Sequence, residues 1–250
     1  VEVIHLGHNR SAQEVVDAAI QEDVHGIALS SYQGGHMEYF TYIRELLNLA
    51  GANNIKIFGG GGGVITPSEI KILHSRGISR IYSPQDGMEI GLNGIIDDMI
   101  EKAIGSTLDG VDFSKFDVKK LDKRQIAKVV TAIEDNGELP VTFSKGSVPV
   151  LGITGTGGAG KSSLIDELLL RFYRHSPNCK IALISVDPTK KRTSGALLGD
   201  RIRLGSASFS NFYIRSLATR DSNTELSPHI KDVVSFLKSQ DFDLILVETS

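Results

Sequence analysis

Short apolar segments rich in β-branched residues alternate with helical patterns along the first hundred residues. The apolar segments are Val1–Leu6, Gly26–Ser30, Ile55–Phe58 and Arg80–Tyr82. Strands that alternate with helices in this way are typical of βα units on a parallel sheet. The pattern therefore predicts an α/β domain in the first part of the chain.

Local signals mark where several of these helices begin and end. Ser11 and Glu14 have the spacing of a capping box, in which a hydroxyl and a carboxylate bind each other's backbone N–H groups. Thr66 and Glu69 repeat that spacing, with Pro67 at the first helical position, where its missing N–H costs nothing. Glycines suited to the left-handed position after a helix follow the periodic segments at Gly51, Gly77 and Gly105.

The stretch from Gly105 to Gly146 has a different character, because it is rich in Lys and Asp and poor in large apolar residues. Apolar residues recur at helical spacing between Leu121 and Ile133, which predicts one amphipathic helix. We interpret residues 105–146 as a charged helical linker between a domain at 1–104 and another at 147–250.

A second α/β pattern begins near Pro149 and continues to the last residues. Because the chain starts inside one strand and stops just after another, we expect both domains to be truncated segments of a longer protein. The expected strands are Val148–Thr154, Lys180–Val186, Phe212–Ser216 and Asp243–Glu248, and the expected helices are Lys161–His175 and Pro228–Ser239.

Composition narrows the class of protein. The 250 residues are 40% hydrophobic and 23% charged, which excludes a disordered or collagen-like chain. A net charge of -3 argues against nucleic-acid binding by bulk charge, and no apolar run is long enough to cross a membrane. A single cysteine, Cys179, allows no internal disulfide and indicates a reducing compartment.

Residues 155–162 match the phosphate-binding pattern G-x-x-x-x-G-K-[ST] without a mismatch, between a predicted strand and a predicted helix. Glycines there let successive N–H groups surround phosphate oxygens at the positive end of a helix. Lys161 would reach the β and γ phosphates, and the Ser162 hydroxyl would bind Mg²⁺. The alternative is a glycine-rich turn that binds nothing.

Three carboxylates in the second half are candidate magnesium partners, because the carboxyl ends of parallel strands face the ligand crevice. Asp187 and Glu248 each end an apolar strand, and Asp200 follows Gly199. For Asp200 an ordinary surface position is equally compatible with the sequence. The polar segment Thr189–Gly199 contains a basic run and is either a switch loop or a solvated surface.

Glycine-rich loops also follow two strands of the first half. Ser30-Ser31-Tyr32 runs into Gly34-Gly35-His36, and Phe58 runs into five glycines, Gly59–Gly63. Backbone without side chains at strand ends allows a bulky ligand to approach, although a flexible loop is the alternative.

These motifs resemble two known families. Val1–Ala103, with its Ser30-Ser31-Tyr32 and Gly59-Gly60 strand ends, resembles the cobalamin-binding domain of acyl-CoA mutases. The second half, with its phosphate loop and the sequences at 186–189, 198–201 and 247–249, resembles the metallochaperone GTPases that guard those mutases. The order of the two domains resembles that of the fused isobutyryl-CoA mutase family. The resemblance implies a flavodoxin-like (Rossmann-type) domain followed by a P-loop NTPase domain.

The resemblance also implies roles for individual residues. Tyr32 stands where many members of the family have leucine. The implied magnesium site comprises Ser162, Asp187, Asp200, Glu248 and Thr249. The implied nucleotide contacts are Gly157, Gly158, Ala159, Gly160, Lys161, Ser162, Ser163 and Arg203, and the implied cobalamin contacts are Ser30, Tyr32, Gly59 and Gly60.

In function, the resemblance implies adenosylcobalamin, GTP and Mg²⁺ as cofactors and a homodimeric, cytoplasmic protein when intact. That protein would isomerise isobutyryl-CoA and n-butyryl-CoA by radical chemistry, and its GTPase would gate cofactor loading. The acyl-CoA would bind a mutase domain outside this chain, so we expect the segment alone to lack mutase activity and to bind cobalamin weakly or not at all.

Two sequence motifs of such proteins do not occur in the 250 residues: the cobalt-ligand loop D-x-H-x-x-G and the guanine-selecting N-K-x-D. Two alternatives therefore stand beside the mutase interpretation. One is a cobalamin-sensing regulator whose output is an NTPase. The other is a P-loop ATPase with a receiver-like regulatory domain.

Overall fold

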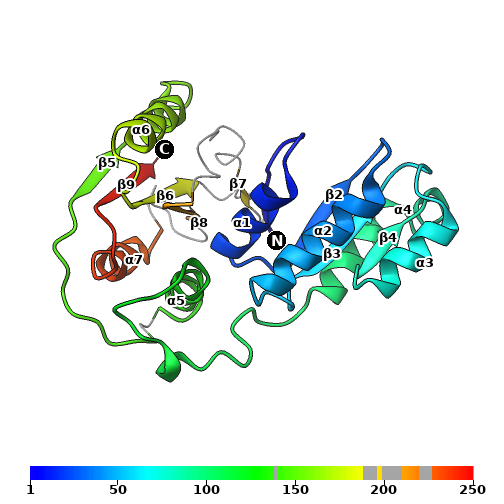
Figure 1. Cartoon of the computed structure of the whole chain (residues 1–250), viewed down its shortest axis with the longest axis horizontal. Helices are drawn as coiled ribbons and strands as arrows, with labels where there is room; N and C mark the ends of the chain where they lie inside the picture. Colours follow the sequence, from blue (N-terminus) through cyan, green and yellow to red (C-terminus); the bar gives the residue numbers. More distant parts are fainter. Residues whose placement is uncertain (138–139, 188–195, 199–209, 220–226, 250) are drawn as a thin grey trace. The chain divides into compact units, whose positions relative to one another are not determined.

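The computed structural model describes residues 1–250 apart from 138–139, 188–195, 199–209, 220–226 and 250. Its internal contacts form two compact units. One unit is Ser11–Asp109, and the other joins Val1–Arg10 to Gly110–Ser250. Both are α/β structures built on parallel sheets, as the sequence predicts (Figure 1). No helix of the described residues is long and apolar enough to cross a membrane.

The unit Ser11–Asp109 is built on a three-stranded parallel sheet in the order β2-β3-β4. Its fully buried residues include Phe40, Ile57 and Leu73, so the core lies between the sheet and its helices. The strands are β2 (Gly26–Ser30), β3 (Lys56–Gly60) and β4 (Arg80–Tyr82), and the helices are α1 (Ala12–Gln21), α2 (His36–Leu49), α3 (Pro67–Ser75) and α4 (Pro84–Lys102).

Helix caps in this unit follow the predicted chemistry. Both predicted capping boxes form, Ser11 with Glu14 at α1 and Thr66 with Glu69 at α3. By contrast, α2 begins at Gly35 with a left-handed φ of 94° and no side-chain cap. The three glycines expected after helices all have positive φ, at 67° for Gly51, 89° for Gly77 and 124° for Gly105. A third capping box, Ser83 with Asp86, starts α4.

The first apolar segment does not join this sheet, so its predicted place in the βα repeat is wrong. The strand β1 (Glu2–Ile4) instead pairs in parallel with β7 (Ala196–Leu198). A strand of three residues with two exposed side chains buries too little apolar surface for its sequence pattern to specify a partner.

The larger unit is built on a four-stranded parallel sheet in the order β5-β9-β6-β8. The predicted elements are confirmed with boundaries shifted by a few residues. The strands are β5 (Val150–Ile153), β6 (Ile181–Asp187), β8 (Phe212–Ala218) and β9 (Leu244–Thr249), and the other elements are η1 (Phe113–Lys115), α5 (Lys123–Asn136), α6 (Lys161–His175) and α7 (Ile230–Leu237).

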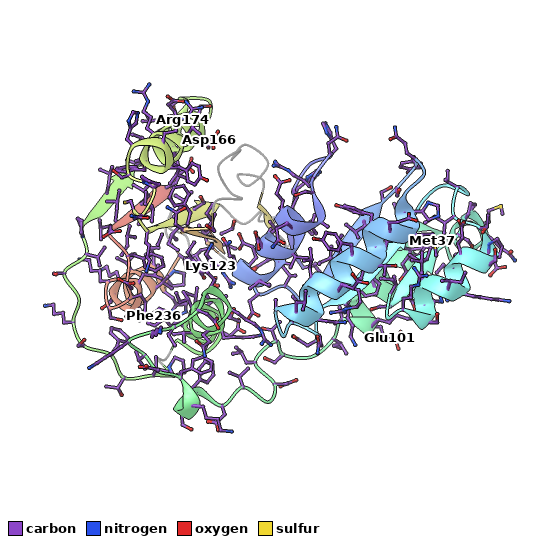
Figure 2. The ribbon with its side chains drawn as sticks, viewed as in Figure 1. Met37, Glu101, Lys123, Asp166, Arg174 and Phe236 are labelled. Atoms are coloured by element: carbon purple, nitrogen blue, oxygen red, sulfur yellow. The ribbon has the colours of Figure 1, made fainter. Side chains whose placement is uncertain are left out.

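Alternate residues of the buried strands separate the two faces of this sheet. Ile181 and Leu183 pack with Leu169 of α6, whereas Ala182 and Ile184 pack with the helices α5 and α7. Phe236 of α7, labelled in Figure 2, is fully buried with Ala182 and Ile184 on the face covered by α5 and α7. Both faces of the sheet are therefore covered, which explains why β6 is apolar along its length.

The predicted linker helix contributes directly to this core. Ala127, Val130 and Ile133 of α5 are fully buried against the sheet. On the same helix, Glu134 forms a buried ion pair with Arg215 of β8, at 2.7 Å from Oε2 to Nη2. The segment 105–146 is thus more than a connection, because its helix is a structural layer of the second unit. The boundaries at 104 and 146 remain predictions.

Replacing Glu134 by Ala should lower the free energy of unfolding of this unit by about 3 kcal/mol, because Arg215 loses its buried countercharge. Urea denaturation followed by circular dichroism measures the change. The matched control is Glu167→Ala, which breaks an exposed ion pair with Arg171 and should cost less than about 0.5 kcal/mol. Equal losses in the two variants would contradict the role given to the buried pair.

Candidate functional site

The phosphate-loop sequence forms a strand–loop–helix, as its motif requires. The loop leaves β5 and enters α6 at Lys161, with Gly160 as a left-handed N-cap at φ 85° and no side-chain cap. A Cβ placed on Gly157, Gly158 or Gly160 would meet no atom within 4 Å, so this side of the loop faces open space. The backbone is therefore accessible to a ligand as large as a phosphate chain.

Lys161 lies across its own loop. Its Nζ donates to the carbonyl oxygen of Gly155 at 2.5 Å and to that of Thr156 at 3.2 Å. A lysine held by backbone carbonyls can exchange those contacts for phosphate oxygens, which are stronger acceptors. The arrangement is suited to neutralising a phosphate within the loop.

A buried hydrogen bond connects the phosphate loop to the central strand. The Ser162 hydroxyl donates to Oε1 of Glu248 at 2.8 Å, and the Ser185 hydroxyl lies 3.5 Å from Oε2. The strand register explains why these side chains lie together, because Glu248 of β9 is paired with Ile153 on one side and Ser185 on the other. These are hard oxygen donors of the type that Mg²⁺ prefers, so the residues present fit that ion.

Ser185 was not among the residues predicted for this site. The signal was available, since Ser185 stands two positions before Asp187 and alternate residues of a strand share one face. A serine in an otherwise apolar strand, on the same face as a candidate magnesium ligand, is a signal for a second polar residue at the site.

Of the other residues predicted for this half, some end strands of the sheet and others lie outside the described residues. Asp187 ends β6 with its backbone paired to Ala218, and Thr249 ends β9 beside Val186. Asp200, Arg203 and the basic run within 189–199 lie outside the described residues, apart from the strand β7. Within the part of the chain that is described, no three His, Cys, Asp or Glu side chains gather as a metal site.

In the smaller unit, the predicted strand ends do meet. Ser30 pairs with Gly60 at the carboxyl ends of β2 and β3, and the Ser31 N–H donates to the Gly60 carbonyl at 2.9 Å. Tyr32 follows and is 71% exposed. Three of the four predicted cobalamin residues are thus at one edge of the sheet, with Gly59 one residue inside it.

Packing explains part of the glycine run that the sequence attributes to a ligand. A Cβ on Gly59 would lie 2.9 Å from Cδ1 of Ile81 and 3.0 Å from Cζ of Phe40. A Cβ on Gly61 would lie 2.5 Å from the carbonyl oxygen of Ser31. Open space within 4 Å is instead found at Gly34 and Gly35, in the other loop.

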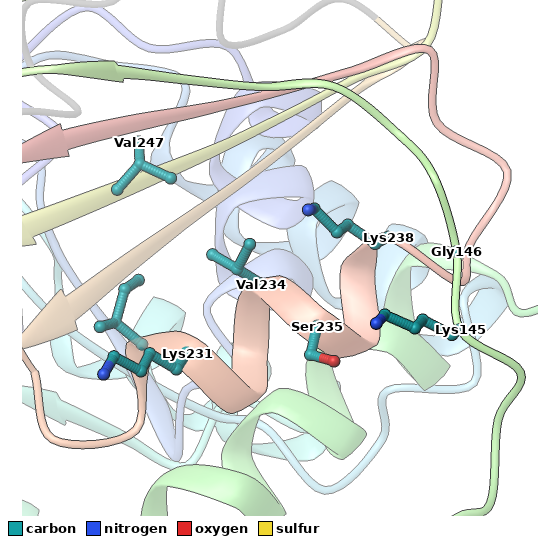
Figure 3. Close-up of a pocket in the computed structure, with 8 residues that line it drawn as sticks. Lys145, Gly146, Lys231, Val234, Ser235, Lys238 and Val247 are labelled. Carbon is teal, nitrogen blue, oxygen red and sulfur yellow. The ribbon is translucent and has the colours of Figure 1, made fainter.

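A cavity of about 410 Å³ lies against α7, and its lining residues are not among those predicted for either site (Figure 3). Its apolar wall includes Val247, which precedes Glu248 and therefore faces the opposite side of the sheet. The remaining lining residues are Lys145, Gly146, Ile230, Lys231, Val234, Ser235 and Lys238.

Comparison with known proteins assigns the two halves. Residues 1–79 match the family model of the B12 binding domain, and residues 139–250 match that of the methylmalonyl Co-A mutase-associated GTPase MeaB. The chain therefore joins a B12-binding domain to a P-loop GTPase domain, which excludes the receiver-like alternative. The B12 match includes the first ten residues, although β1 pairs with β7 in the structure.

Over its whole length the chain is a homologue of fused isobutyryl-CoA mutases. It is 54% identical to the protein of that name from Geobacillus kaustophilus and 49% identical to that from Cupriavidus metallidurans, over 100% of this chain in each case. The fused isobutyryl-CoA mutase of Nocardia farcinica is 46% identical over 99% of the chain. The chain spans about a quarter of the length of these relatives, 24% in each.

Substituting Gly59 by Ala should lower the free energy of unfolding of the smaller unit by about 1–3 kcal/mol, because the added methyl group overlaps Phe40 and Ile81. Thermal or urea unfolding provides the measurement. Gly34→Ala is the matched control, since its Cβ would meet nothing within 4 Å. An equally mild effect in both variants would show that packing does not require glycine at 59.

Proposed function

We propose that this chain is the cofactor-binding and GTP-hydrolysing part of a cobalamin-dependent acyl-CoA mutase. The intact protein would interconvert isobutyryl-CoA and n-butyryl-CoA. The observation that carries the proposal is the similarity of the whole chain to fused isobutyryl-CoA mutases, together with a complete phosphate loop in one of its two domains. The acyl-CoA would bind a mutase domain outside these residues, so the segment alone would lack mutase activity.

Phosphoryl transfer from GTP would depend on electrostatic positioning in the larger unit. Lys161 would bind the β and γ phosphates, while the backbone from Gly157 to Gly160 and Ser163 would surround them. Ser162 would hold Mg²⁺, with the Glu248 carboxylate next to it at hydrogen-bonding distance. We extend the magnesium site to Asp187, Asp200 and Thr249 and the nucleotide site to Arg203 by family resemblance.

Cobalamin would bind at the edge where β2 and β3 end. Ser30, Tyr32 and Gly60 meet there, and the open side of Gly34 and Gly35 leaves room for a bulky group. Gly59 would contribute by keeping Phe40 and Ile81 in place beneath that edge. Adenosylcobalamin supplies, when bound, the carbon radical that starts the rearrangement.

The two activities would be coupled, with GTP hydrolysis gating the loading of the cofactor. A homodimer in the cytoplasm is the assembly we propose for the intact protein. A cobalamin sensor with an NTPase output would have the same two domains but no mutase activity, so an assay of the full-length protein with isobutyryl-CoA separates the two functions.

Lys161→Ala should weaken the binding of Mg²⁺-GTP by more than about tenfold, because a charge-assisted contact to phosphate is lost. Fluorescence titration with a labelled GTP analogue measures it, and ATP in parallel tests the preference for guanine. Lys180→Ala is the control, since that lysine pairs with Asp241 away from the loop. Unchanged GTP affinity in the Lys161 variant would contradict the proposed nucleotide site.

The chain should bind adenosylcobalamin weakly, because its 250 residues lack the D-x-H-x-x-G motif that supplies a cobalt ligand in the family. Equilibrium dialysis at high cofactor concentration measures the affinity. We expect the absorbance spectrum of the bound cofactor to show no histidine ligand from this chain. Tight binding with a histidine signature would contradict this expectation.

A further inference from the structure

One buried histidine directly follows a loop that borders the proposed cobalamin edge. His36 is the first residue of α2, directly after Gly35, and is only 6% exposed. Neither ring nitrogen has a hydrogen-bond partner among the described residues, and Nε2 lies 3.3 Å from Oε1 of Glu69. The contact is at ion-pair distance and helps to lower the pKa of Glu69, after the hydrogen bonds from Thr66. Met37, labelled in Figure 2, is the next residue of the helix.

Glu69 divides its two carboxylate oxygens between two helices. Oε2 accepts hydrogen bonds from the Thr66 N–H and hydroxyl, both at 2.8 Å, and so completes the cap of α3. These hydrogen bonds are the main reason that the pKa of Glu69 is lowered, so the carboxylate is charged at neutral pH. Oε1 remains to face His36 at the start of α2.

The His36–Glu69 contact lies where the loops 31–35 and 61–66 lead into α2 and α3, and a hydrogen bond already connects the strand ends where these loops begin. The loop 31–35 begins at Ser31, whose N–H donates to the carbonyl of Gly60, the last residue of β3 before the loop 61–66. The Tyr32 ring also lies over Gly62, whose Cβ would be 2.9 Å from Cε1. His36 and Glu69 follow these loops on α2 and α3, so their contact sets the spacing of the loops at the far ends.

The energetic balance of this contact is unfavourable for stability alone. A buried imidazole whose ring nitrogens have no well-formed hydrogen bond among the described residues costs free energy, and a leucine of similar size would not carry that cost. Departures of this kind from well-satisfied packing concentrate at functional sites. We propose that His36 and Glu69 are positioning residues that hold the two loops at the spacing cobalamin requires. The inference rests on the proposed function.

The test compares three variants of the whole chain for affinity and stability. His36→Leu removes the His36–Glu69 contact and Glu69→Gln removes the carboxylate from it, while the glutamine can still cap α3. Thr66→Ala is the control that removes the capping hydroxyl, while the backbone N–H at position 66 can still bind Oε2 of Glu69 and both partners of the His36–Glu69 contact are kept. Affinity for adenosylcobalamin is measured by equilibrium dialysis, and stability by urea unfolding.

We expect His36→Leu and Glu69→Gln to weaken cobalamin binding by about three- to tenfold. His36→Leu should be as stable as the unmodified chain or more stable, and Thr66→Ala should lose stability with little change in affinity. If His36→Leu lowers stability while affinity is unchanged, the residue is merely structural and the inference is overturned.

Hydrogen exchange tests the same contact without the cofactor. In Glu69→Gln and His36→Leu, the amides of Ser31 and Val64 should exchange faster by about three- to tenfold, whereas that of Ala52, bonded to Leu47 within α2, should not change. Unchanged exchange at Ser31 and Val64 overturns the inference. Faster exchange in the variants supports the inference even where the chain binds too little cofactor to titrate, whereas failure of the full-length protein to bind cobalamin would count against the proposed function alone.

Discussion

The larger unit depends on the position of one strand. The strand β9 lies between β5 and β6, and its register places the Glu248 carboxylate beside the first turn of α6. A buried carboxylate requires partners, and Ser162 and Ser185 supply hydroxyls from the phosphate-loop helix and the neighbouring strand. The remaining layers, α6 on one face and α5 with α7 on the other, hold that register by burying the apolar residues before it.

Successive side chains of β9 point to opposite faces of the sheet, so the candidate ligand residue and the packing residues alternate along the strand. Leu246 packs under α6, Val247 faces α7 and its cavity, and Glu248 returns to the face of the phosphate loop. A change of one residue in register would bury Val247 at the loop and expose the carboxylate to α7. The positions of the ligand residues are thus fixed by the same hydrophobic pattern that builds the sheet.

Features governed by local chemistry could be predicted from the sequence, and those governed by distant partners could not. The capping boxes at Ser11 and Thr66 and the phosphate loop depend on residues a few positions apart, and all formed. The partner of β1 is nearly two hundred residues away, and three residues carry too little pattern to select it. The sequence predicts the amphipathic helix α5 but places it in a charged linker, because the many charged residues around it give no sign of the sheet that its apolar face covers.

The glycines show the same limit at the level of single residues. A cluster indicates that backbone must come close to something, but the sequence does not say whether that is a ligand or a side chain of the same domain. The backbone of Gly59 lies close to the side chains of Phe40 and Ile81, whereas a Cβ on Gly158 would face open space. The three-dimensional neighbours decide between these, and they come from strands and helices distant in sequence.

Helix beginnings provide a final contrast. The helices α1, α3, α4 and α5 begin with capping boxes, whereas α2 and α6, which follow the two candidate binding loops, begin at a glycine without a side-chain cap. Within the described part of the chain, their first turns therefore begin without a side-chain acceptor for the backbone donors of the helix end. In thermodynamic terms, each ligand would act as a component of the fold, and its release would be coupled to fraying of the helix end that it had completed.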